Sequence, residues 1–246
     1  MTALAKPALG LTRDQWHRYV AHYPPAPPTG PLVGVTTAIK LQDILIPGDL
    51  PTWGGGLAAD YLLEHYTHSP DAGVRAMFRS QALATISRQR DIGTEAHSQI
   101  EKILLGQPVA PTERTAPYVY AFSSFMAAHR PEFLLTEAMV CNLTASYAGT
   151  FDFAARIGGK VALVDTKTGR PRASHRIQLA LYGGAEFVGF EGVTTRKRIP
   201  KFDAYYCLYL TPDGYEFVDL EVTPADLEHG LFLVDAYHRI RAWEKE

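Results

Sequence analysis

Two stretches near the middle of the chain are rich in Val, Ile, Phe and Thr, and the pair Gly158–Gly159 joins them. β-Branched and aromatic residues favour strands, and a Gly-Gly pair supplies the positive φ angles that a two-residue hairpin turn needs. The pattern therefore predicts two adjacent strands, around residues 149–157 and 160–169, with a tight turn between them.

Each predicted strand carries charge where a core strand is usually apolar. Asp152 stands among apolar residues in the first strand, and Asp165-Thr166-Lys167 ends the apolar run of the second. Because strand side chains alternate, Asp165 and Lys167 are expected to share one face and Thr166 to point away. A hairpin partner can bring Asp152 alongside them. Two carboxylates and an ammonium at the end of a buried hairpin are costly unless an ion compensates them, so this stretch is a candidate functional site.

Apolar residues at helical spacing, together with capping residues, predict helices on both sides of this hairpin. The predicted helices span residues 12–23, 57–66, 72–105, 115–130, 173–187 and 223–243. Residues 33–39 are predicted to form a short strand or an extended lead-in. Further strands are predicted over residues 133–141, 205–210 and 215–220, the last two joined by a Pro-Asp-Gly turn. This order of elements predicts a single α/β domain with a central mixed sheet flanked by helices.

The segment Pro24–Pro28 is almost entirely proline. Proline stops a helix and makes a stiff, extended connection, so this segment is the best candidate for a boundary. Residues 1–30 are therefore expected to form an N-terminal arm, and residues 31–246 the main domain.

Composition narrows the class of protein. The chain has 246 residues, of which 46% are hydrophobic and 20% charged, as in a globular protein with a sizeable core. Its net charge of −2 means that nucleic-acid binding would have to rest on a local basic patch. The only two cysteines, Cys141 and Cys207, cannot alone hold an iron–sulfur cluster, and we expect reduced, buried thiols. No apolar run approaches the ~20 residues of a membrane span, and we expect a cytoplasmic protein without a signal peptide.

Asp152 followed by Asp165-Thr166-Lys167 forms the pattern D…(D/E)-x-K. Gly93-Thr-Glu-Ala-His97 precedes the pattern on a predicted helix, and Gln178 and Tyr182 follow it at i, i+4 on another. With these motifs in this order, the chain resembles the PD-(D/E)XK nuclease superfamily, and within it the RecB-like exonuclease branch, most of all the small RecB-type exonucleases of phages. The resemblance covers roughly residues 93–183, with weaker similarity at 33–53.

The resemblance implies a restriction-endonuclease-like core and a site that hydrolyses phosphodiester bonds with Mg²⁺ or Mn²⁺, as one or two ions. Mg²⁺ prefers oxygen ligands, and a second ion would join when DNA is bound. The implied metal ligands are Asp152, Asp165, the backbone carbonyl of Thr166, His97 and, as an accessory ligand, Glu137. Related CRISPR-associated nucleases of this branch carry four cysteines for an iron–sulfur cluster, which this chain lacks.

The same resemblance assigns roles to three further side chains. Lys167 would position or deprotonate the attacking water, and a nearby divalent cation would lower its pKa. Gln178 and Tyr182 would orient Lys167 or a DNA phosphate from one face of their helix.

Two groups of basic residues follow the candidate site along the chain. Close to an active-site hairpin such residues are expected to contact the DNA backbone, although a merely solvated face is the alternative. These residues are Arg170, Arg172 and Arg176, and then Arg196, Lys197, Arg198 and Lys201.

The expected function is a metal-dependent DNA exonuclease in recombination, replication or repair. Its expected partner is DNA, with a recombinase or a single-strand-binding protein as further candidates. One alternative is a restriction-type endonuclease on the same fold, against which we see no extra recognition domain. Another is an inactive DNA-binding or scaffolding subunit, against which the intact Asp152, Asp165 and Lys167 argue.

Overall fold

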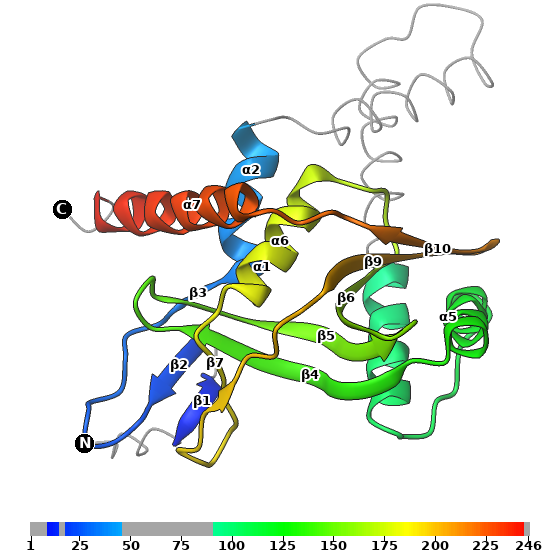
Figure 1. Ribbon diagram of the computed structural model, residues 1–246, viewed down its shortest axis with the longest axis horizontal. Coiled ribbons are helices and arrows are strands. Elements are labelled where there is room, and N and C mark those ends of the chain that lie inside the picture. The colour runs from blue at the N-terminus through cyan, green and yellow to red at the C-terminus, as the bar shows by residue number, and fades with distance from the viewer. Residues whose placement is uncertain (1–8, 15–17, 46–90, 244–246) are drawn as a thin grey trace, which may run out of the picture.

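Two long antiparallel strands, β4 (Glu132–Asn142) and β5 (Tyr147–Ile157), lie in the middle of a mixed sheet (Figure 1). The computed structural model describes residues 9–14, 18–45 and 91–243, and within these ranges the sheet has eight strands. On one side of the central pair lie β6 (Lys160–Lys167), β9 (Ala204–Thr211) and β10 (Gly214–Asp219). On the other side lie β7 (Phe187–Val188) and β8 (Lys197–Arg198), while β3 (Val33–Gly34) pairs with the start of β5. The predicted α/β fold with a central mixed sheet is confirmed.

The predicted hairpin is also confirmed. Strands β5 and β6 run antiparallel, and Gly158 and Gly159 between them have φ angles of 55° and 83°. Both angles lie in the left-handed region, where glycine pays no steric penalty. Strand β6 then pairs in parallel with β9, so the sheet is mixed.

Helices pack on both faces of the sheet (Figure 1). One face is covered by α1 (Val35–Ala38), α6 (Ala173–Gly183) and α7 (Pro224–Trp243), with α2 (Lys40–Leu45) beside them. The other face is covered by α5 (Ala116–His129) and by the helical residues 91–104. The predicted helix 57–66 and the first part of the predicted helix 72–105 lie outside the described residues. The predicted helix 173–187 ends earlier than expected, because Gly183 and Gly184 close α6 before β7 begins.

The prediction of a helix over residues 12–23 is wrong. This segment forms a two-stranded antiparallel hairpin of β1 (Gly10–Arg13) and β2 (Tyr19–His22). Leu11, Ala21 and Tyr23 are buried and pack with side chains of the main sheet, including Phe187. These residues therefore belong to the packed core rather than to a separate arm.

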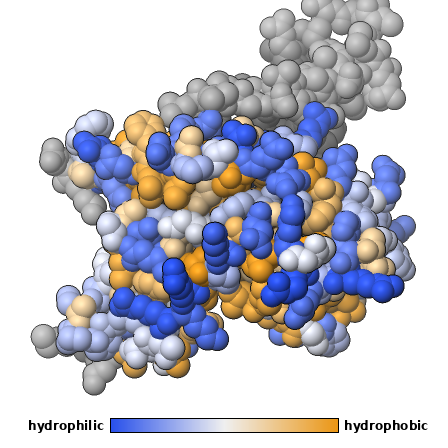
Figure 2. Space-filling model, in the orientation of Figure 1, coloured by the Kyte–Doolittle hydropathy of each residue, from blue (hydrophilic) through white to orange (hydrophobic). Residues whose placement is uncertain are grey.

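The thiols of Cys141 and Cys207 are buried and are not joined in a disulfide, as predicted. Within the described ranges, no helix combines the length and the apolar composition needed to cross a bilayer. Figure 2 shows hydrophilic side chains over much of one face of the molecule, with hydrophobic side chains between them.

Candidate active site

Strands β5 and β6 separate next to Asp152. Their pairing ends at Phe153 and Val164, whereas β6 stays paired with β9 to its last residue. Beyond this point the Asp152 carboxylate accepts a hydrogen bond of 2.6 Å from the backbone amide of Thr166. A side chain thus bridges the two strands where their backbones no longer pair, and it holds Asp152 beside the end of β6.

The predicted residues of β6 and α6 form one polar network. The Gln178 amide Nε2 donates to Asp165 Oδ1 at 3.2 Å and to the Tyr182 hydroxyl at 2.9 Å. The Lys167 ammonium makes an ion pair with Asp165 Oδ2. Asp165, Gln178 and Tyr182 are buried, whereas the Lys167 side chain is 22% exposed. Solvent therefore reaches the network at Lys167.

Close backbone packing holds α6 against the site. Gln178 and Tyr182 lie one helical turn apart, so both side chains project from one face of α6. The Tyr182 ring lies over Gly149 of β5, where a Cβ atom would come within 2.5 Å of a ring carbon. Only glycine at position 149 lets the Tyr182 ring approach the strand this closely.

The charges of this network depend on one another. Burial raises the pKa of Asp165, the Lys167 ammonium opposes that rise, and the neighbouring Asp152 adds to it. Burial lowers the pKa of Lys167, but Asp165 and Asp152 outweigh burial and the net direction is upward. With the Asp165 and Asp152 carboxylates beside it, Lys167 is therefore protonated near neutral pH.

Glu137 lies across from Asp152, between the strand pairs Thr136–Phe153 and Ala138–Phe151. Its φ angle of 46° is unusual for a residue with a side chain. The sheet is irregular here, because Phe151 and Phe153 pack into core clusters on opposite faces although only one residue separates them. The accessory position predicted for Glu137 therefore lies next to Asp152.

Burial and neighbouring carboxylates change the pKa of Glu137. Its pKa is raised to about 8 by burial first, then by the charges of Asp152, Glu101 and Asp165, while Arg13 acts to lower it. Glu101 lies on the helix of residues 91–104, one turn after His97. The structure therefore brings Glu101 within electrostatic reach of Glu137.

The helix of residues 91–104 also brings His97 to the site. His97 is half-buried and acts electrostatically to lower the pKa of Asp165. A Cβ atom on Gly93 would come within 2.7 Å of the Thr168 hydroxyl, so the glycine lets this helix approach the end of β6. The upstream motif and the Asp-x-Lys motif are therefore neighbours in space.

The donor set fits a hard divalent cation. Within the described residues, no group of three or more His, Cys, Asp or Glu side chains is arranged to hold a metal ion by itself. Mg²⁺ commonly uses only one or two carboxylates and keeps several waters. Asp165 Oδ2 is buried and faces the Lys167 ammonium, and burial and carboxylate charges raise the pKa values of Asp165 and Glu137. A cation among these oxygens would relieve their repulsion.

A buried pair close to Lys167 was not predicted. His175 Nδ1 and the Tyr209 hydroxyl are 2.9 Å apart, and Tyr209 is the strand partner of Lys167 in the β6–β9 register. Burial first, and then the Lys167 charge, lower the pKa of His175 to about 4. Its position three residues before Gln178 on the same helix face could have revealed His175, but no pattern in the sequence connects β9 to the site.

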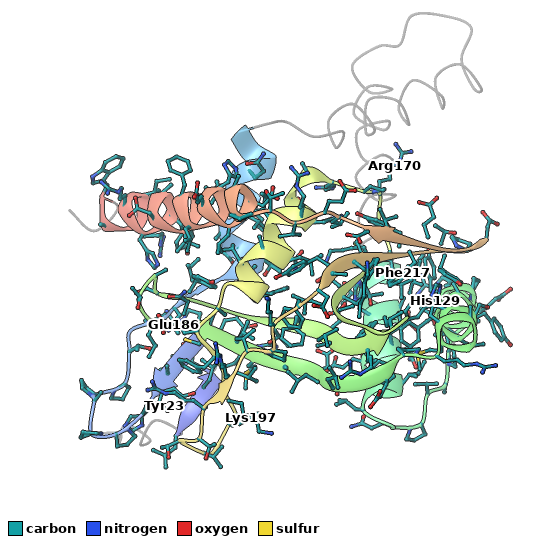
Figure 3. The ribbon with its side chains drawn as sticks, in the orientation of Figure 1. Tyr23, His129, Arg170, Glu186, Lys197 and Phe217 are labelled. Carbon is teal, nitrogen blue, oxygen red and sulfur yellow. The ribbon has the colours of Figure 1, made fainter. Side chains whose placement is uncertain are left out.

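The predicted DNA-binding residues lie in different surroundings. Arg176 pairs with Asp226 at 2.8 Å, and the Arg196 guanidinium lies 4.0 Å from the centre of the Tyr23 ring. Lys197 lies over the Phe190 ring at 5.1 Å. Figure 3 shows Arg170 pointing outward beyond the end of β6, and Tyr23 and Lys197 near the N-terminal hairpin. The remaining members are exposed: Arg172, Arg198 and Lys201. Arg176, Arg196 and Lys197 thus already have contacts within the protein.

Comparison with known proteins leaves the family open. The chain matches no protein-family model and none of the curated proteins. Among solved structures, one titled "Crystal structure of SSO0001" aligns with 77% of this chain and 86% of that chain, at 17% identity and a TM-score of 0.33.

Proposed function

We propose that this protein is a metal-dependent deoxyribonuclease of the PD-(D/E)XK type that degrades DNA from its ends, as RecB-like exonucleases do. One observation carries the proposal. Residues from three separate motifs, Asp152, the Asp165–Lys167 segment and the Gln178–Tyr182 pair, meet in a single buried hydrogen-bonded site. A chance D-x-K sequence would not be expected to find these partners.

The chain's own residues supply the positioning. Asp152 fixes the end of β6 through the Thr166 amide, and Gln178 orients the Asp165 carboxylate. Lys167 lies at the solvent-exposed edge of the network, where its ammonium would hydrogen-bond the attacking water. The Tyr182 hydroxyl accepts a hydrogen bond from the Gln178 amide and so helps to fix its orientation. These contacts preorganise the carboxylates before substrate arrives.

Asp152, Asp165 and the Thr166 carbonyl would hold Mg²⁺ or Mn²⁺, with His97 and Glu137 close by. When bound, such an ion supplies charge stabilisation for the phosphoryl oxygens and lowers the pKa of a bound water.

Digestion of end-labelled DNA tests this function. Linear duplex, single-stranded DNA and covalently closed circles would be incubated with Mg²⁺, Mn²⁺ or EDTA. We expect loss of linear DNA with either metal, intact circles, and no cleavage in EDTA. Asp165→Ala and Lys167→Ala should each lower the rate by at least ~10²-fold. Asp235→Ala is the control, because Asp235 is an exposed carboxylate on α7.

The possible failures are distinguishable. Cleavage of closed circles would replace the exonuclease with an endonuclease on the same site. Absence of cleavage by wild-type protein with every metal and substrate would remove the enzymatic function. Wild-type rates in both site variants would show that the nuclease activity lies elsewhere.

A further inference from the structure

The N-terminal hairpin places an arginine at the edge of the candidate site. Arg13 Nη2 donates to Thr150 Oγ1 at 2.8 Å and to the Tyr19 hydroxyl at 3.0 Å. The Tyr19 and Thr150 oxygens are 2.9 Å apart, and the Arg13 guanidinium carbon lies 5.1 Å from the centre of the Tyr19 ring. The three side chains form a closed network that fixes the direction of the guanidinium.

This network lies next to the carboxylates. Thr150 is two residues before Asp152 on β5. Arg13 is close enough to Glu137, the residue across from Asp152, to act to lower the pKa of that carboxyl. Arg13 itself is exposed. The guanidinium is therefore held at a solvent-facing rim of a site where a phosphodiester would meet several negative side chains.

No carboxylate among the described residues neutralises Arg13 in an ion pair, so its charge is available to a bound anion. Its hydrogen-bond partners are neutral hydroxyls, and within the described ranges no carboxylate lies at ion-pair distance from it. In contrast, Arg176 is paired with Asp226, and Arg196 is stacked on aromatic rings. Guanidinium has five donors in a planar fork, so Nε and Nη1 remain for a further acceptor.

We propose that Arg13 binds a phosphate group of the nucleic-acid substrate beside the carboxylate site, with Tyr19 and Thr150 holding its guanidinium in place. Nη2 stays on the two hydroxyls while Nε–H and Nη1–H remain for phosphate oxygens, a division of donors between nitrogens that the single ammonium of lysine cannot reproduce. This inference rests on the proposed nuclease function and adds a substrate-binding residue from a segment outside the family resemblance.

Equilibrium binding separates a phosphate contact from a structural role. A short fluorescein-labelled single-stranded oligonucleotide would be titrated by fluorescence anisotropy in Ca²⁺, at several salt concentrations, with thermal unfolding of every variant. Arg13→Gln should weaken binding about tenfold and reduce the slope of log affinity against log salt by roughly 0.7. Arg13→Lys should keep the slope but bind more weakly than wild type, because one nitrogen must then serve both the hydroxyls and the phosphate.

Two matched variants serve as controls. Thr150→Val breaks the same anchoring hydrogen bond but leaves the arginine, so it should keep the wild-type salt slope. Arg239→Gln removes an exposed arginine on α7 and should change nothing.

Three outcomes would overturn the inference. If wild type binds and cleaves DNA but Arg13→Gln behaves as Arg239→Gln does, Arg13 does not bind phosphate and the nuclease function stands. If Thr150→Val and Arg13→Gln lose affinity and slope equally, the network is structural only. If wild type neither binds nor cleaves, the nuclease function itself fails, and the inference fails with it.

Discussion

The Asp152 carboxylate hydrogen-bonds the Thr166 backbone amide at 2.6 Å, at the place where β5 and β6 have stopped pairing. The two strands separate here, while β6 continues alongside β9. The backbone amide of Thr166 on β6 thus receives its acceptor from a side chain that also supplies charge to the candidate site. The same residue therefore contributes to both folding and the proposed chemistry.

Two substitutions at Asp152 should separate these contributions. Asp152→Asn keeps an oxygen that can accept from Thr166, so unfolding in urea with EDTA should be close to wild type, while cleavage is lost. Asp152→Ala leaves the buried Thr166 amide without its partner, which should cost about 1–3 kcal/mol of unfolding free energy. Equal stabilities for the Asn and Ala variants would show that the hydrogen bond contributes nothing.

The main sheet could be predicted because its sequence features are local. The Gly158–Gly159 turn, the flanking β-branched residues and the cap of α7 each act within a few residues. The N-terminal hairpin could not be predicted, because residues 12–23 carry helix-compatible residues and a plausible cap. Burial of Leu11 and Ala21 against the main sheet decided its structure, and such tertiary contacts override local propensity.

Glu137 should make stability depend on pH. Its folded-state pKa of about 8 is above the ordinary value of 4.5, so the native state binds more protons than the unfolded state between these values. Stability should therefore fall as pH rises from about 5 to 8. Glu137→Gln should remove this loss and, in EDTA, stabilise the protein at pH 8 by on the order of 4 kcal/mol.

Chemical unfolding at pH 5 and pH 8 in EDTA checks the Glu137 prediction. Glu132→Gln is the control, because Glu132 starts the same strand but its side chain is 72% exposed. A Glu137→Gln variant that gains no more stability at pH 8 than at pH 5 would rule out the raised pKa.

The site was predictable only in part, for a physical reason. Asp152, Asp165, Lys167, Gln178 and Tyr182 are close in sequence and follow a known spacing. Arg13, Glu101 and Tyr209 reach the same region through tertiary packing of a hairpin, a helix and a strand. No local pattern contains that information. The charge of a residue such as Arg196 likewise says nothing of the rings that it covers.

Arg196 should therefore matter for stability. Its guanidinium lies 4.0 Å from the centre of the Tyr23 ring and 4.8 Å from that of Phe187, which fastens the segment before β8 onto the hairpin and the sheet. Arg196→Ala should lower the unfolding free energy by about 0.5–1 kcal/mol, the usual contribution of an exposed cation–π contact. Arg198→Ala, two residues away and exposed, should leave stability unchanged in the same thermal or urea titration. Equal effects of the two variants would contradict a stacking role for Arg196.

His175 should give the protein a second, opposite pH dependence. It is buried, its Nδ1 lies 2.9 Å from the Tyr209 hydroxyl, and burial with the nearby Lys167 charge lowers its pKa to about 4. The unfolded state therefore binds more protons than the native state between about pH 4 and pH 6.5. The stabilisation is fully present above pH 6.5 and is lost as pH falls toward 4, by roughly 2–3 kcal/mol.

His175→Asn isolates this effect, because an asparagine can still contact the Tyr209 hydroxyl but does not titrate in this range. Urea unfolding of wild type and variant at pH 6.5 and pH 4 should show a smaller acid loss for His175→Asn. Other groups titrate over the same range, so the difference between variants carries the result. If His175→Asn and wild type lose equal stability between the two pH values, His175 is not held neutral by its surroundings.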